Sequence, residues 1–186
     1  MTIHPGTTNR RPLVLGSLVA AASVALLAFP ALAQAAPNPA SPGSVQAHVA
    51  VSSAITLSGL PVGFLLSGIP TDTVATGGVN QDGPVTMTVW TNNTQGYTVT
   101  VQAVGALTGA VAGNTDTIPA SALRVRESGS SAGYQAVSAT NAVTVYSKDT
   151  PSSVVGDALS NDYSLTIPFV AQDTYTTTLN YIATTN

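Results

Sequence analysis

The chain has 186 residues, with five Lys or Arg, eight Asp or Glu and no cysteine. Its net charge of −3 excludes the basic footprint of a nucleic-acid-binding protein and a polybasic patch for anionic lipid. Without cysteine the fold has no disulfides, thiol catalysis or cysteine-ligated metal, so core packing must stabilise it.

The N-terminal region has the pattern of a secretory signal peptide. The pair Arg10-Arg11 is followed by the uncharged residues 13–33, and small residues then permit cleavage after Ala33 or Ala35. We therefore expect a helical signal peptide over residues 1–35, membrane contact only during export, and an extracellular or cell-surface location. A permanent membrane anchor is the alternative, because the apolar stretch approaches the length that spans a bilayer.

The remainder divides into a tether and one domain. Residues 36–44 are rich in Pro, Ser and Gly and predict a flexible tether. Residues 45–186 are long enough for one domain of ordinary size. Residues 36–186 contain 23 Thr and one Lys, a composition that favours strands over helices.

Alternating apolar and polar residues predict strands in the following ranges, taken in chain order: 45–51 with an extension of the pattern at Ile55 and Leu57, 85–90, 97–103, 123–127, 143–146, 163–169 and 175–183. Residues 91–96 favour a turn and predict a β-hairpin between the second and third ranges. Residues 171–174 predict the turn of a final hairpin. Pro168 cannot donate to a ladder, so its strand is expected at a sheet edge or bulged.

Two weaker features complete the chain. Residues 105–117 predict a long loop, and residues 119–122 predict a single helical turn. About eight or nine short strands separated by turn signals predict one all-β domain, an antiparallel Ig-like β-sandwich.

The two predicted hairpins carry a resemblance. The residues Gly96-Tyr97-Thr98-Val99-Thr100 and the C-terminal range 175–183 resemble, in order and spacing, the two Trp-x-Leu motifs of bacterial WxL surface domains. Tyr97 and Tyr181 stand at the family's tryptophans, and Val99 and Ala183 at its leucines. The resemblance implies a secreted WxL-like β-sandwich that attaches non-covalently to the cell wall.

The residues needed for catalysis are sparse. His48 is the one histidine after the signal peptide, no Gly-x-Ser-x-Gly elbow is present, and the acidic residues lie beside turn formers. The best calcium candidates, residues 80–83 and Asn161-Asp162, match no calcium-loop pattern and are explained by turns. We predict that the protein is not an enzyme and takes no cofactor or metal.

Three aromatic residues are candidate ligand contacts: Trp90, Tyr97 and Tyr181. Trp90 is out of phase with the apolar residues of its strand, so it points away from the core or lies near the end of the sheet. The alternatives are a Trp90 ring packed under a rim loop and tyrosines that belong to the core.

These features give three hypotheses. The first is a secreted, non-enzymatic bacterial surface or matrix protein, bound to cell-wall polymer or to other surface proteins. The second is a polysaccharide-binding module with Trp90 as a stacking residue. The third is a pilin-like assembly subunit in which residues 36–44 donate a strand to a neighbour. The sequence leaves the oligomeric state open.

Overall fold

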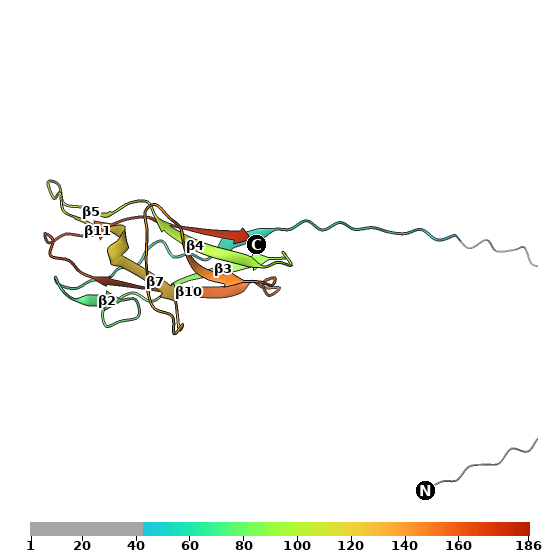
Figure 1. Cartoon of the computed structure of the whole chain (residues 1–186), viewed down its shortest axis with the longest axis horizontal. Helices are drawn as coiled ribbons and strands as arrows, with labels where there is room; N and C mark the ends of the chain where they lie inside the picture. The colour runs from blue at the N-terminus through green and yellow to red at the C-terminus, as the bar shows by residue number, and fades with distance from the viewer. Residues whose placement is uncertain (1–42) are drawn as a thin grey trace, which may run out of the picture. The chain divides into compact units, whose positions relative to one another are not determined.

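The computed structural model describes residues 43–186, so the predicted signal peptide and most of the predicted tether lie outside the described residues. Within residues 48–186 the strands form three antiparallel sheets (Figure 1). The structure is all-β, as predicted. In the described part of the chain, no helix is long and apolar enough to cross a membrane.

The largest sheet has the order β1-β3-β10-β7-β8, and its sixth strand, β2, pairs with the C-terminal end of β10. The other two sheets have the orders β12-β4-β9 and β11-β5-β6. The strand bounds are β1 Ile55–Ser58, β2 Thr73–Ala75, β3 Val85–Thr91, β4 Tyr97–Ala103, β5 Leu107–Gly109, β6 Thr117–Ile118, β7 Leu123–Glu127, β8 Gln135–Ala136, β9 Val143–Lys148, β10 Asp157–Thr166, β11 Tyr175–Thr176 and β12 Leu179–Thr185.

The core lies between the six-stranded sheet and the β12-β4-β9 sheet. Every second residue of β3 and β4 is buried, as the alternation predicts for strands with one face against a core. The buried side chains of both sheets form one hydrophobic cluster, which includes Val89, Val99, Val125 and Tyr163. Each buried valine contributes about 1.5–3 kcal/mol through removal of its apolar surface from water. The arrangement is a β-sandwich.

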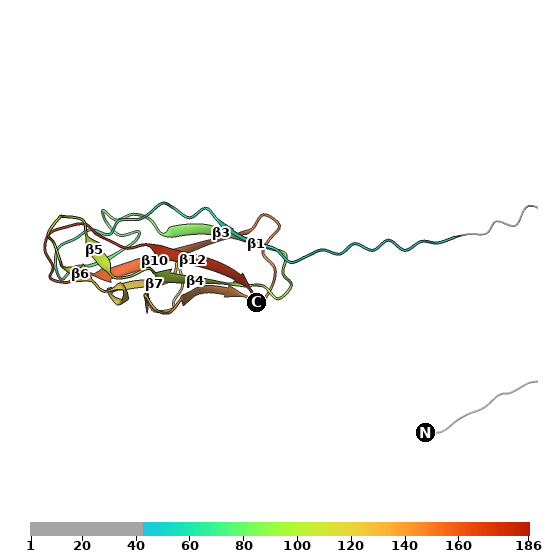
Figure 2. The ribbon, with the colours of Figure 1, turned by 90° about the horizontal axis from the view of Figure 1, so that it is seen from above.

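Both predicted hairpins are wrong. β3 pairs with β1 and β10, whereas β4 pairs with β12 and β9, so consecutive strands lie in opposite sheets. In Figure 2 the ribbons of β3 and β4 are clearly separated. Likewise, β10 lies in the six-stranded sheet and β12 in the opposite one. Alternation shows which face of a strand is buried, but it does not identify the neighbouring strand, and a short connection can also cross between sheets.

The N-terminal strand prediction is wrong over residues 45–51 and is confirmed only for its extension at Ile55 and Leu57. Residues 43–54 form no strand, and every one of them is exposed. The first strand, β1, begins at Ile55 and contains both residues of that extension. The alternating apolar residues at 45–51 therefore have no sheet partner in the described structure.

Three smaller predictions have mixed outcomes. β10 lies inside its sheet, between β3 and β7, and it ends at Thr166 before Pro168, so the predicted edge or bulged strand at Pro168 is wrong. The predicted loop over residues 105–117 contains β5 and the first residue of β6. The predicted helical turn is confirmed as a 3-10 helix, η1, over Ala120–Ala122.

Candidate functional site

Trp90 lies on the outer face of the six-stranded sheet. Its neighbours Val89 and Thr91 are buried, while Trp90 retains 36% of its surface exposed. It stands opposite Thr56 of β1 in the antiparallel register. The prediction that Trp90 points away from the core is confirmed, because its phase on β3 is opposite to that of the buried residues.

A shallow depression lies on the same sheet, and its lining includes Thr88, two residues along β3 from Trp90. Its volume is about 260 Å³, and its lining consists of Gly59, Thr86, Met87, Thr88, Ala158, Leu159 and Ser160. Thr88 and Trp90 are two residues apart on one strand, so their Cα atoms lie about 7 Å apart and their side chains share a face. Thr86 stands opposite Ser160, and Thr88 opposite Ala158.

The hollow follows from the small residues at its centre. Ala158 offers only a methyl group beside Thr88, and Gly59, with a φ of 74°, has no side chain. Thr86, Thr88 and Ser160, each of which carries a hydroxyl group, are among the lining residues. The outer face thus carries a partly exposed indole and, two residues away along β3, a hollow whose lining includes three hydroxyl-bearing residues. This outer face has the chemistry of a binding surface for a ligand with both apolar and hydroxylated faces.

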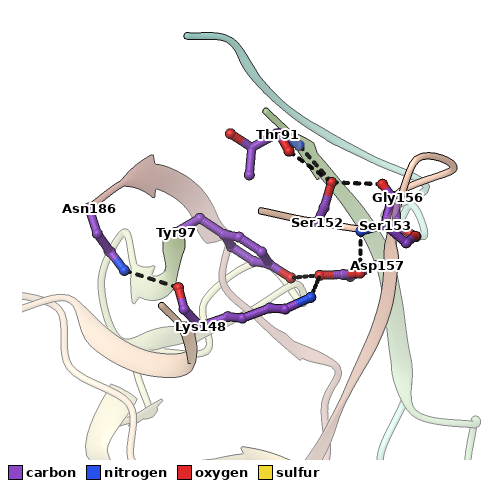
Figure 3. Close-up of polar contacts among 8 residues, drawn as sticks. All are labelled: Thr91, Tyr97, Lys148, Ser152, Ser153, Gly156, Asp157 and Asn186. Atoms are coloured by element: carbon purple, nitrogen blue, oxygen red, sulfur yellow. Dashed lines mark hydrogen bonds and ion pairs between the residues drawn. The ribbon is translucent and has the colours of Figure 1, made fainter. Parts of the chain in front are cut away.

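Tyr97 does not lie where a ligand could contact it. It lies on the inner face of β4 with no exposed surface, which matches the alternative that it is a core residue. Its ring packs on Tyr146, with 5.7 Å between the ring centroids. Its hydroxyl donates to Asp157 Oδ2 at 2.8 Å (Figure 3). The Tyr97 ring therefore has no free face for a ligand.

Asp157 is the centre of a polar cluster at this end of the sandwich. Lys148 Nζ donates to Asp157 Oδ2 at 2.8 Å, and the Ser153 amide donates to Oδ1 at 2.9 Å. Burial raises the pKa of the Asp157 carboxyl. The hydrogen bonds from Lys148, Ser153 and Tyr97 outweigh that effect and hold the pKa below its usual value. Because Tyr97 and Lys148 lie on β4 and β9 while Asp157 begins β10, the cluster joins the two facing sheets.

Tyr181 is half-buried, and its hydroxyl already has two partners. The hydroxyls of Tyr163 and Tyr181 lie 2.6 Å apart, and Tyr181 donates to Asn161 Oδ1 at 3.2 Å. Since Tyr181 uses its proton in the bond to Asn161, Tyr163 is the donor to Tyr181. Burial raises the pKa of Tyr181 to about 12, although the bond from Tyr163 acts in the opposite direction. Tyr181 thus closes an internal hydrogen-bond chain.

The residues considered for calcium have structural partners. Asn161 and Asp162 lie within β10 rather than in the predicted turn. Asp162 bonds Arg126 at 3.3 Å and Ser128 at 2.7 Å. Asp82 Oδ2 accepts from the Leu65 amide at 2.7 Å. Among residues 43–186, no group of three or more His, Cys, Asp or Glu has the arrangement of a metal site.

Sequence reasoning identified Trp90 but missed the depression and the Asp157 cluster. One signal was present, because Thr86 and Thr88 share the phase of Trp90 on β3. The other side of the depression comes from β10, and no local pattern places that strand beside β3. His48, for its part, lies exposed outside the strands.

Comparisons with known protein families, characterised proteins and solved structures found no match to this chain. The resemblance to WxL domains therefore stays a prediction that rests on the residues of the two motif regions.

Proposed function

We propose that the protein is an exported, non-enzymatic bacterial surface protein that binds cell-wall polysaccharide non-covalently. The binding surface is the outer face of the six-stranded sheet, with Trp90 as the stacking residue. Export rests on the signal-peptide pattern of residues 1–35. Residence at the wall then comes from contacts of the β-domain itself.

The partly exposed indole on the same face as the depression carries the proposal. A sugar ring has an apolar C–H face that stacks on an aromatic side chain, and hydroxyls that bond to Thr and Ser. Trp90 supplies the aromatic face, and Thr86, Thr88 and Ser160 supply the hydroxyls. Tyr97 is fully buried and Tyr181 is half-buried with its hydroxyl already bonded, so Trp90 is the most exposed of the three candidate aromatics.

The shape and charge of the surface favour a neutral polymer. Sites for small molecules enclose most of the ligand, whereas this depression is shallow and open along the sheet. An open surface accommodates a chain that passes across it. None of the residues that line the depression is charged, so an uncharged glycan backbone binds here without burying an unpaired charge.

Sedimentation with insoluble cell wall tests the proposal. We expect wild-type protein to pellet with purified wall and Trp90→Ala to bind at least tenfold more weakly, because stacking is lost. Trp90→Phe keeps an aromatic ring and should retain part of the binding. Ile182→Ala is the matched control, since Ile182 is an exposed apolar residue, 53% accessible, on a strand of the opposite sheet.

Two further arms make the result decisive. Soluble polysaccharides from outside the cell, used as competitors, separate a wall ligand from an external glycan of the same chemistry. Circular dichroism and thermal melts establish that each variant is folded. Wild-type protein that stays in the supernatant, or folded Trp90→Ala that pellets as well as wild type, contradicts the proposal.

A further inference from the structure

Residues 45–51, called the Val segment below, have the pattern of a strand without a partner. Val45, Val49 and Val51 are 95%, 87% and 80% exposed, and the described structure places the segment in no sheet. The alternate positions between these valines are Gln46, His48 and Ala50. In an extended conformation, one face of the segment is therefore apolar, with a side chain at every second residue. Such a segment gains burial for its valines only when it joins a sheet.

β12 offers the free edge that such a segment needs. It is the outermost strand of its sheet, pairs on one side with β4, and is seven residues long, like the Val segment. Edge strands are normally protected by charge, proline, a bulge or short length. β12 has no charged residue and no proline.

The other sheet edges carry protection that β12 lacks. β9 ends in Lys148, and its pairing with β4 shifts register at a bulge. The remaining edge strands are short: β6, β8 and β11 have two residues each, β2 has three and β1 has four. Among the described strands, β12 is therefore the longest edge strand with a ladder partner on one side only, and β1 of the facing sheet packs beside it without ladder pairing.

The free backbone groups of β12 can be identified by residue. The backbone amide of Asn186 donates to the Gly96 carbonyl, and the Thr178 carbonyl accepts from the backbone amide of Val104. The backbone N–H and C=O groups of the even-numbered residues of β12 therefore point toward β4. Because ladder bonds alternate along an antiparallel strand, the amides of Tyr181, Ala183 and Thr185 face outward. The side chains of Tyr181 and Ala183 are only half-buried against the core, so an added strand would cover them.

We propose that the Val segment of one copy pairs with the free edge of β12 of a second copy, so that the protein assembles by strand addition. This goes beyond wall binding and uses a different surface from Trp90. The donor differs from the predicted donor arm, residues 36–44, because the apolar alternation begins at Val45.

Hydrogen bonds next to the Val segment favour a second copy over the same chain. Asn92 Oδ1 accepts from the Ala54 amide at 2.7 Å, and its Nδ2 donates to the Ser52 carbonyl at 2.9 Å. Asn93 bonds the carbonyl of Asn186, so β12 ends at the same end of the sandwich. To reach its own β12, the Val segment must reverse at residues that Asn92 holds in place. A neighbouring copy requires no such reversal.

Donor and acceptor lie at different places on one chain, so the contact is heterologous and can propagate. We therefore expect concentration-dependent oligomers of the purified protein in size-exclusion chromatography with light scattering. Val49→Asp places a charge on the apolar face of the Val segment and should give monomers. Ala50→Asp adds the same charge on the opposite face of the segment and should leave the oligomers intact.

Complementation tests donor and acceptor together. Ala183→Pro removes an outward amide of β12 without removing a bond to β4, and it should also give monomers. Thr185→Pro is the second acceptor variant if Ala183→Pro does not fold. A mixture of Val49→Asp with either folded proline variant retains one donor and one acceptor, so heterodimers should form.

The proposal is overturned if the wild-type protein is monomeric throughout, if Ala50→Asp dissociates oligomers as fully as Val49→Asp does, or if the mixture stays monomeric. Protection of the Val segment from hydrogen exchange in a monomer would assign it to its own chain and also overturn the proposal. The affinity of each site for soluble wall glycan fragments, measured by Trp90 fluorescence, should be the same in Val49→Asp and wild type, so failure of assembly and failure of glycan binding are distinguishable.

Discussion

Removal of the Tyr97 hydroxyl tests whether the Asp157 carboxylate joins the two sheets. Tyr97 is fully buried and donates to Asp157 Oδ2 at 2.8 Å, and the same oxygen accepts from Lys148. A hydrogen bond to a charged group contributes about 1.5–3 kcal/mol. We therefore expect Tyr97→Phe to lower the free energy of unfolding by about 2 kcal/mol, which lowers Tm by roughly 4–8 °C in a domain of this size.

The Asp157→Asn variant should cost more, because its amide places a donor group opposite two donors. We expect a loss of about 3 kcal/mol, since one buried hydroxyl loses its acceptor and the partly exposed Lys148 loses its ion pair. The double variant should lose about 1–2 kcal/mol less than the sum of the single losses, because both remove one shared bond.

Urea unfolding of the four proteins in this double-mutant cycle measures the coupling. Tyr134→Phe is the control, because the Tyr134 ring packs on Arg126 and its hydroxyl has no hydrogen-bond partner within residues 43–186. We expect a loss below about 0.5 kcal/mol for this control. Strict additivity of Tyr97→Phe and Asp157→Asn would refute the inference that the two side chains support each other.

Three further predictions concern the same framework. The pKa of Asp157 is held low, so its stabilising contribution is present above about pH 4 and is lost as pH falls through the folded-state pKa. In acid titrations the difference in unfolding free energy between wild type and Asp157→Asn should shrink below pH ~4, and a constant difference contradicts the assignment. Gly96 has a φ of 84°, and an added Cβ would collide with the Lys148 carbonyl oxygen. Gly96→Ala should therefore cost more than about 3 kcal/mol in urea unfolding, and a loss under about 1 kcal/mol is inconsistent with this geometry. Tyr163→Phe removes the bond to Tyr181 and should lower stability by about 1–2 kcal/mol, whereas an unchanged Tm would show that the bond contributes nothing.

Individual strands were predictable from the sequence because their alternation records burial. β3 and β4 were located almost to the residue, since Val85, Val89, Val99 and Val101 recur with period two and face one core. Their pairing was not predictable. The residues that separate them suit both a hairpin and a crossing between sheets, and the choice depends on partners elsewhere, β1 and β10 for β3.

The candidate site was predictable in part for the same reason. The phase of Trp90 relative to Val89 determines that the indole points outward, and this is local information. The depression depends on Ala158 and Ser160, which reach β3 only through the register of β10. The Val segment shows the opposite case. Its alternation predicts a strand, but the described structure contains no strand that pairs with it.

Fluorescence of Trp90 tests the central claim most directly, because the chain contains one tryptophan and its emission reports on the proposed stacking residue alone. Titration of the purified protein with soluble wall glycan fragments should shift the emission to shorter wavelength and saturate, since a stacked sugar excludes water from the exposed indole. Thr88→Val removes a hydroxyl from the rim and should weaken the apparent affinity without abolishing the shift. An emission spectrum that no wall glycan changes, in a folded protein, would contradict the account.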